Sequence, residues 1–236
     1  MIEVEWWEFE SAREMAEQVA GDIGFIVESA IEAHGGARLA IPGGSTPDLI
    51  YQRLLKTKID WPKVSLILTD DRLVGRDDPK SNFARMHELF APTGANVVPI
   101  VEDTKLDDYR EAGRLANARL SLLDWPLDLA CLGMGEDGHT ASIFPGPDYE
   151  AALTGPRERH AVGVRPDPLP STAPVDRVTL TAAAFASARA VMVVIRGAQK
   201  KEVLERAIEE GPLSSKPIGR VLAGVDTAID VFWSPD

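Results

Sequence analysis

Short apolar segments alternate with helical segments along this chain, and this alternation constrains the fold more than any other feature of the sequence. The runs that read as buried strands are residues 37–41, 64–69, 127–132, 190–195 and 227–232. The spacing of apolar residues predicts helices at about 47–56, 81–90, 105–123 and 198–210. Strands that are apolar along their whole length are typical of a parallel sheet covered on both faces. We therefore predict an α/β fold with a doubly wound, mainly parallel sheet and helices on both faces.

The first part of the chain predicts a strand followed by a long helix. Residues 2–9 have strand-like composition, and apolar residues then recur at helical spacing from Met15 to Ile31. Ser11 followed three positions later by Glu14 is a capping-box pattern, and the glycines at 35 and 36 are stop signals. We expect the helix to run between these signals.

The composition indicates one globular domain over residues 1–236. The chain is 44% hydrophobic and 26% charged, and a single α/β unit of this length is common. Its longest aliphatic run, residues 190–195, is far too short to cross a bilayer. The net charge of −12 argues against nucleic acid or an anionic membrane as a partner. A small anionic ligand would need a local group of cations.

The start of the chain and its single cysteine favour a cytoplasmic protein. The opening "MIEVEWWEFESAREM" carries acids where a secretory signal has a basic region, so we expect no export signal. Cys131 lies in an apolar run, and we expect it to be a buried thiol without a catalytic role. Residues 145–176 are rich in proline and are interpreted as an excursion from the core.

Ligands of parallel α/β sheets bind beyond the carboxyl ends of the strands, so the residues that follow each predicted strand are the candidates for a site. The first such stretch is "AIPGGSTPDLI". Gly43 and Gly44 let the backbone approach a ligand, and Ser45 and Thr46 add hydroxyl groups beside a helix start, which suits a phosphate. An ordinary strand-to-helix turn with Thr46 as its N-cap explains these residues about as well.

The second stretch is "LILTDDRLVG", in which Asp70, Asp71 and Arg72 follow an apolar strand directly. An arginine there could hold a phosphate through two hydrogen bonds, and Asp70 could accept a hydrogen bond from a sugar hydroxyl. A solvated loop with an acid–arginine pair is the alternative.

The third stretch, "LACLGMGEDGHTASIFPG", contains a G-x-G-x-x-G pattern. A dinucleotide-binding turn would open a long helix, yet Pro145 follows within seven residues of Gly138, so we reject that interpretation. His139, flanked by Asp137, is placed to act as a general base whose ring is fixed by a neighbouring acceptor. A structural histidine is the alternative. We expect no metal site, because no second histidine or cysteine lies at ligand spacing.

The fourth stretch is "VIRGAQKKEVLERAIEE". Lys200 falls in the first turn of a predicted helix, where a cation is unfavourable unless it meets an anion. Arg177 in "APVDRVTLT" is a further candidate cation. The alternatives are a solvated helix start for Lys200 and a surface charge for Arg177.

Taken in order, "PGGSTP", "TDDR", "SNF", "LGMGEDGHTASIFPG", "DRVTLT" and "GAQKKEVL" resemble the 6-phosphogluconolactonases, whose relatives include the glucosamine-6-phosphate deaminases. The resemblance covers about residues 40–210. It implies a Rossmann-like fold and hydrolysis of 6-phosphogluconolactone to 6-phosphogluconate without a metal or organic cofactor. It also implies that Gly43, Gly44, Ser45 and Thr46 line the site. Arg72, Arg177 and Lys200 would hold the phosphate, and His139 would activate water.

The chain departs from the family where Asp-Glu-Arg-Trp is common, since it has Asp70, Asp71, Arg72 and Leu73 there. This leaves the division of roles between the two acids open. We take His139, Asp70 and Asp137 as the candidate catalytic residues.

We expect water to attack the lactone directly, because no serine lies in a G-x-S-x-G turn, and we expect backbone N–H groups in 133–138 to stabilise the oxyanion. The partner would be a small phosphorylated sugar lactone, and the protein a monomer or homodimer. The alternatives are an amino-sugar-6-phosphate isomerase or deaminase and a sugar-phosphate sensor without turnover.

Overall fold

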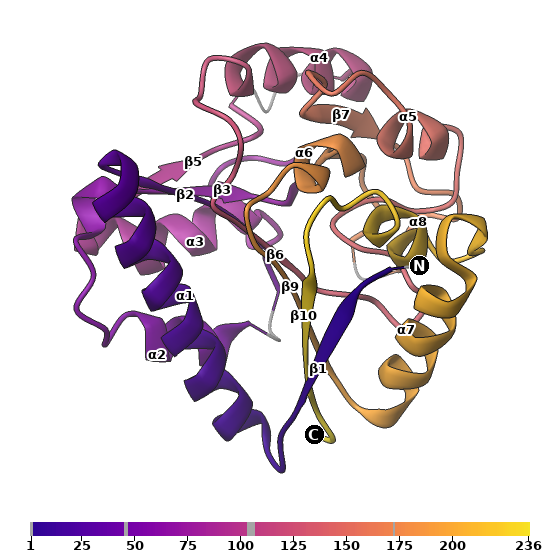
Figure 1. Ribbon diagram of the computed structural model, residues 1–236. Coiled ribbons are helices and arrows are strands. Elements are labelled where there is room, and N and C mark those ends of the chain that lie inside the picture. The colour runs from indigo at the N-terminus through magenta and orange to yellow at the C-terminus, as the bar shows by residue number, and fades with distance from the viewer. Residues whose placement is uncertain (1, 45–46, 103–106, 172) are drawn as a thin grey trace.

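The computed structural model describes residues 2–44, 47–102, 107–171 and 173–236, and these contain a seven-stranded sheet at the centre (Figure 1). All pairs of neighbouring strands in this sheet are parallel. In spatial order the strands are β1 (Val4–Glu8), β10 (Ile229–Ser234), β9 (Val191–Arg196), β6 (Leu129–Leu132), β2 (Ala37–Ile41), β3 (Val64–Leu68) and β5 (Asn96–Val98). The predicted parallel sheet is confirmed, and β5 is the strand that the sequence did not predict.

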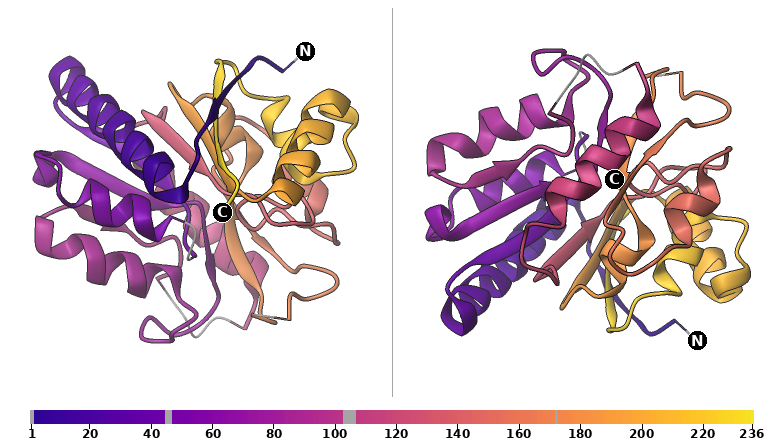
Figure 2. Two further views of the ribbon diagram at one scale, coloured as in Figure 1. Left: turned by 90° about the horizontal axis from the view of Figure 1, so that it is seen from below. Right: turned by 90° about the horizontal axis from the view of Figure 1, so that it is seen from above.

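Helices cover both faces of this sheet, as predicted (Figure 2). One face carries α1 (Ala12–His34), α2 (Asp48–Leu54) and α3 (Asn82–Phe90). The other carries α4 (Tyr109–Leu120), α6 (Ala182–Ala186), α7 (Ala198–Glu210) and α8 (Pro217–Leu222). Along β9, Val193 packs into one core and Val194 into the other, because successive side chains of a strand point to opposite faces. This double burial explains why the strands are apolar throughout.

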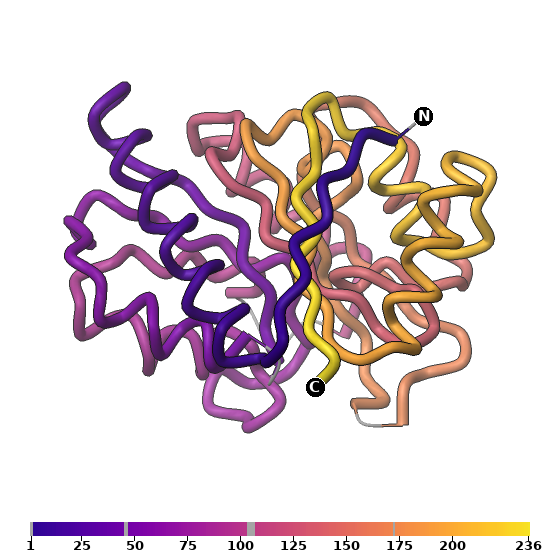
Figure 3. Tube along the Cα trace, turned by 60° about the horizontal axis from the view of Figure 1, so that its bottom comes forward, coloured from indigo at the N-terminus to yellow at the C-terminus, as the bar shows by residue number. Residues whose placement is uncertain are grey.

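The predicted signals bound the first helix. The side chain of Ser11 accepts a hydrogen bond from the amide of Glu14 at 3.3 Å, which satisfies one of the free N–H groups of the first turn. Gly35 ends the helix in the left-handed conformation with φ 86°, which a glycine adopts without strain. The strand that precedes this helix, β1, lies beside the last strand, β10, so both ends of the chain belong to one edge of the sheet (Figure 3).

A second, antiparallel sheet lies beside the first and was not predicted. Its strands are β4 (Asp70–Arg72), β8 (Arg177–Leu180) and β7 (Ala161–Val164), in that spatial order. The proline-rich excursion contributes β7 and α5 (Tyr149–Leu153) to the structure. Three 3₁₀ turns, at Trp61–Lys63, Ala91–Thr93 and Gly211–Leu213, complete the described elements. None of the described helices combines the length and the apolar character that a bilayer span requires.

The strand order creates a crevice between β2 and β6. From β2 the chain proceeds outward to β3 and β5, then returns to β6 on the other side and continues to β9 and β10. At such a switch point the connections leave the two neighbouring strands in opposite directions, and ligands bind beyond their carboxyl ends. The fold therefore predicts a binding site beside Pro42 and Gly133, the residues that follow these two strands.

Candidate active site

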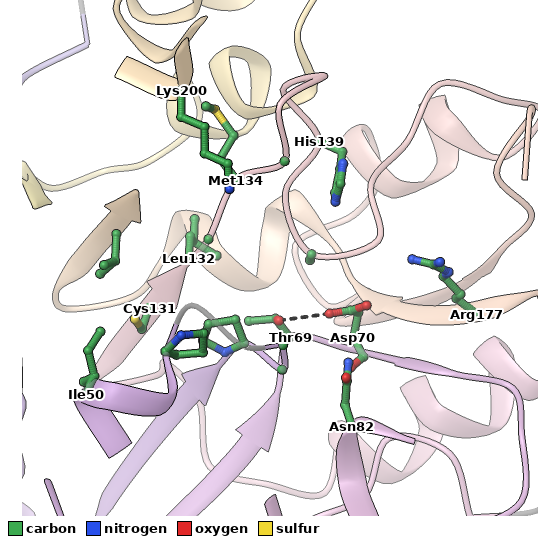
Figure 4. Close-up of a pocket in the computed structure, with 18 of the residues that line it drawn as sticks. Ile50, Thr69, Asp70, Asn82, Cys131, Leu132, Met134, His139, Arg177 and Lys200 are labelled. Carbon is green, nitrogen blue, oxygen red and sulfur yellow. Dashed lines mark hydrogen bonds between the residues drawn. The ribbon is translucent and has the colours of Figure 1, made fainter. Parts of the chain in front are cut away.

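A cavity of about 470 Å³ lies at that switch point (Figure 4). Its walls come from the segments that follow β2, β3 and β6, from the antiparallel sheet, and from the start of α7. The predicted site residues in its lining are Gly43, Gly44, Asp70, Arg72, His139, Arg177 and Lys200. Two further predicted residues, Ser45 and Thr46, lie outside the described residues. Five separate segments of the chain thus bring predicted residues to one place.

The imidazole of His139 is held by Asp137. Its Nδ1 lies 2.5 Å from Oδ1 of Asp137, and the backbone amide of His139 donates to the same oxygen at 3.2 Å. Partial burial alone would raise the pKa of Asp137, but its hydrogen bond and charge interaction with His139 outweigh burial and lower the pKa. An ionised carboxylate only accepts hydrogen bonds, so Nδ1 carries the proton. The other ring nitrogen, Nε2, is left as an acceptor on a side chain that is 29% exposed.

Two further contacts fix the plane of this ring. The ring of Phe144 stacks on His139, with 4.0 Å between the centroids and 27° between the planes. Gly135 packs against the imidazole so closely that a β-carbon there would lie 2.2 Å from Cε1. Gly135 therefore makes room for the imidazole. Among the described residues no helix begins directly after this loop, since α5 begins only at Tyr149, in keeping with the rejection of a dinucleotide-binding turn.

The backbone of the loop corrects one expectation about oxyanion donors. The amide of Gly135 donates to the carbonyl of His139 at 2.9 Å, and the amide of Gly138 donates to the carbonyl of Gly135 at 3.0 Å. Both N–H groups are used within the turn that presents the histidine. The prediction that residues 133–138 supply oxyanion donors is therefore wrong for these two amides.

The two acids that the sequence left unassigned have different surroundings. Asp70 lines the cavity, and its carboxylate accepts a hydrogen bond from Thr69 Oγ1 at 3.2 Å (Figure 4). It also accepts one from Ser142 Oγ at 2.5 Å. Asp71 is 2% exposed and accepts from the backbone amides of Arg72, Asn82 and Phe83 at the start of α3.

Burial raises the pKa of Asp71 to about 6, against the opposing effect of these amides. Asp70 is thus the acid of the cavity, and Asp71 is an anchor for α3.

Arg72 and Arg177 are directly opposite each other on β4 and β8. Side chains at paired positions of an antiparallel ladder share one face, and like charges there repel unless an anion lies between them. Arg72 donates to the carbonyl of Lys80 and to Asn82 Oδ1, both at 2.8 Å. Arg177, 4% exposed, donates to Ser142 Oγ at 3.3 Å and the carbonyl of Ala173 at 3.1 Å.

All four acceptors are neutral, and within the described residues neither guanidinium is in an ion pair. By contrast, Arg110, Arg165 and Arg220 each pair with a carboxylate. Burial lowers the pKa of Arg177, with Asp70 opposing this effect and Arg72 adding to it. Two uncompensated guanidinium groups on one face make a strong site for an anion.

Lys200 adds a third cation to the cavity. It lies in the first turn of α7, where the helix dipole also favours an anion. Burial lowers the pKa of its amine, and the nearby charge of Glu136 opposes that effect. The next residue, Lys201, instead pairs with Glu8 and lies over the ring of Trp233 at 4.4 Å. The two lysines therefore differ in role although they are adjacent.

Asn82 belongs to the site although no role was predicted for it. Its side-chain Nδ2 donates to the carbonyl of Asp70 at 2.9 Å while its Oδ1 accepts from Arg72. A β-carbon on Gly43 would lie 2.2 Å from Cγ of Asn82, which explains the glycine at this position. The "SNF" triplet could have indicated this role, because the sequence predicts that a helix begins there.

Within residues 2–44, 47–102, 107–171 and 173–236, no group of three or more His, Cys, Asp or Glu side chains is arranged to hold a metal ion. Cys131 lines the cavity but is 2% exposed, and burial raises the pKa of its thiol to about 12. The predicted burial of this thiol is confirmed, and its raised pKa keeps it protonated at neutral pH.

The model of the family described as "Glucosamine-6-phosphate isomerases/6-phosphogluconolactonase" matches residues 10–233. The chain belongs to this family. It is 33% identical to a 6-phosphogluconolactonase of Rhizobium meliloti over 231 residues, which cover 96% of this chain and 97% of the relative. A 6-phosphogluconolactonase of Neisseria meningitidis serogroup A is also 33% identical, with 97% and 98% covered. The crystal structure of a 6-phosphogluconolactonase from Shewanella baltica superposes with a TM-score of 0.90, at 33% identity and 99% coverage of both chains. The family relationship predicted from the motifs is therefore confirmed.

Proposed function

We propose that this protein hydrolyses 6-phospho-D-glucono-1,5-lactone to 6-phosphogluconate, the reaction for which the relatives described above are named. One observation carries the proposal. The same cavity contains two guanidinium groups that have no anionic partner among the described residues, and a histidine whose Nε2 is left to accept a proton. The first feature suits a phosphate, and the second suits hydrolysis.

Arg72 and Arg177 hold the phosphate in this proposal, and Lys200 adds its charge from α7. Because both guanidinium groups are fixed by neutral oxygens, they are oriented before the substrate arrives and keep their full charge for it. The net charge of −12 by itself would repel a phosphorylated substrate, and these cations provide a local attraction that offsets the repulsion.

His139 acts as the general base, and Asp137 holds its ring. Nε2 takes a proton from water while the water oxygen forms a bond to the lactone carbonyl carbon. The bond between that carbon and the ring oxygen then breaks, and the ring oxygen leaves as the hydroxyl of 6-phosphogluconate after receiving a proton from the imidazolium. Asp137 stabilises the imidazolium between these two steps. Asp70 lies within the same cavity and is available to bind a sugar hydroxyl.

Neither a covalent acyl intermediate nor a metal is needed in this scheme. A lactone carbonyl is electrophilic, so anchoring the phosphate and activating water supply most of what the reaction requires. We therefore propose a reaction independent of metal ions and organic cofactors. A lactonase assay, corrected for spontaneous hydrolysis of the lactone, tests for the activity. Repeating the assay with a chelator tests whether the reaction is independent of metal ions.

The sequence leaves two other functions open. An amino-sugar-6-phosphate isomerase or deaminase would use Asp70 as the base, and ammonia release from glucosamine 6-phosphate would favour it. A sensor would bind 6-phosphogluconate without hydrolysing the lactone. The hydrogen bond between His139 and Asp137 favours an enzyme over a sensor, because binding alone requires only the cations. Arg72 and the "GEDGHTASIFPG" stretch favour the lactonase over the deaminase, which would also use His139.

We further propose that residues 1–236 act as one lactonase domain. The cytoplasmic location of the protein and its monomeric or homodimeric state are predictions from the sequence.

A further inference from the structure

Ser142 lies behind the lining of the cavity and contacts two of the lining residues, Asp70 and Arg177. It is fully buried, three residues after His139. Its Oγ lies 2.5 Å from Oδ2 of Asp70 and 3.3 Å from Nη1 of Arg177, and its amide donates to Thr179 Oγ1 at 3.1 Å. A hydroxyl has one proton and can also accept, so Ser142 donates to the carboxylate and accepts from the guanidinium.

The register of the antiparallel sheet brings the two charges within reach of each other. Asp70 pairs with Thr179, and Arg72 pairs with Arg177, so all four side chains share one face of the ladder. Asp70 and Arg177 are consequently diagonal neighbours, a separation that an arginine side chain can span. Two buried opposite charges in this position would ordinarily form a direct ion pair.

The described residues contain no such pair, because the hydroxyl of Ser142 lies between the two charged groups. The backbone holds it there. Ala141, the residue before it, has φ 49°, a left-handed conformation that is uncommon for a residue other than glycine. This conformation turns the chain after His139 so that the next side chain enters the network.

We propose that Ser142 is a positioning residue that keeps Asp70 from pairing with Arg177, so that this guanidinium retains its charge for the phosphate of the substrate. The inference rests on the proposed function, in which Arg177 is part of the phosphate site. Without the hydroxyl, Asp70 and Arg177 pair directly, and the phosphate must then compete with a carboxylate for the guanidinium.

The experiment measures the affinity for 6-phosphogluconate by calorimetry in the wild type, Ser142→Ala, Asp70→Asn and the double variant. Ser142→Ala should bind the ligand about 10-fold more weakly, since a charge-assisted contact is lost. In the double variant no carboxylate is left to capture Arg177, so its affinity should return to that of Asp70→Asn. A purely structural role for the serine predicts no such rescue.

Ser214→Ala is the matched control, because Ser214 is a buried serine that donates to Glu210 at 2.8 Å outside the cavity lining. It should bind like the wild type. Thermal unfolding checks that each variant folds, and Ser142→Cys, which keeps the volume but donates weakly, replaces the alanine variant if that variant does not fold.

Unchanged binding in Ser142→Ala, or weak binding that Asp70→Asn does not restore, would overturn the inference. Failure of the wild type to bind 6-phosphogluconate would instead contradict the proposed function.

Discussion

Gly135 and His139 are in such close contact that residue 135 has no space for a side chain: a β-carbon would lie 2.2 Å from Cε1 of the imidazole. Gly135→Ala should therefore displace the ring and lower kcat by about 100-fold, the effect expected when a catalytic group moves by about 1 Å. Steady-state kinetics measures this. Gly75→Ala is the control, because a β-carbon there meets nothing within 4 Å. Equal kcat values for the two variants would disprove the proposed constraint on the ring.

His139→Asn should lower kcat by about 100-fold or more while leaving the affinity for 6-phosphogluconate within a few fold, because the asparagine cannot take a proton from water. His87→Asn, at an exposed position outside the cavity, serves as the control and should keep wild-type turnover. The general-base role is ruled out if His139→Asn hydrolyses the lactone at nearly the wild-type rate.

Arg177→Gln and Arg72→Gln should each raise KM by roughly 10- to 100-fold, the effect of losing a charge-assisted hydrogen bond to phosphate. Arg114→Gln removes an exposed arginine that pairs with Glu111 and should leave KM unchanged. Lactone kinetics at constant ionic strength tests the comparison. Unaltered KM in both cavity variants would show that the phosphate binds elsewhere.

Binding should weaken at alkaline pH because burial lowers the pKa of Lys200. An amine loses its charge as the pH rises through its pKa, and the usual pKa of a lysine is about 10.4. The affinity for 6-phosphogluconate should therefore begin to fall at a lower pH than an ordinary lysine would cause. The phosphate itself stays a dianion above about pH 7 and contributes no change. Calorimetry of Lys200→Arg should give a flatter pH dependence. The same alkaline loss in that variant would assign it to another group.

The free energy of unfolding should depend on pH through the ionisation of Asp71. Its folded pKa of about 6 lies above the ordinary aspartate value of 3.8, so the folded state binds the proton more tightly than the unfolded chain. This contribution is present below about pH 4 and is lost as the pH rises through about 6.

The free energy of unfolding of the wild type relative to Asp71→Asn should therefore fall by up to about 3 kcal/mol from pH 4 to pH 7. Chemical denaturation at several pH values measures this difference. A rise over the same range would mean that the three backbone amides outweigh burial.

The sequence predicted the parallel sheet because its strands are buried on both faces, which leaves apolar runs such as residues 190–195 that few other folds require. The antiparallel sheet was missed for the opposite reason. β4 and β7 have three and four residues, and β4 reads Asp-Asp-Arg, so neither carries the pattern of a buried strand. The sheet also depends on the pairing of β4 with β8, more than 100 positions further along the chain, which local spacing cannot indicate.

The cavity residues were predictable to the extent that each follows a strand of the sheet. His139, Asp70 and Arg72 were found in this way, since parallel strands bring their carboxyl ends together. Ser142 and Phe144 were not, because their roles depend on where side chains point within an irregular loop. Arg177 was identified only as a nearby cation, and its position opposite Arg72 depends on the unpredicted sheet.

The alternation of side chains along β4 separates the ligand-binding residues from the one that anchors α3: Asp70 and Arg72 project to one face and Asp71 to the other. Insertion or deletion of a single residue just before this strand would exchange the two faces. Such a change of register would turn Arg72 away from the cavity and move Asp71 away from the α3 amides that it accepts from. For this short strand, changes in length are therefore more harmful than changes in residue type.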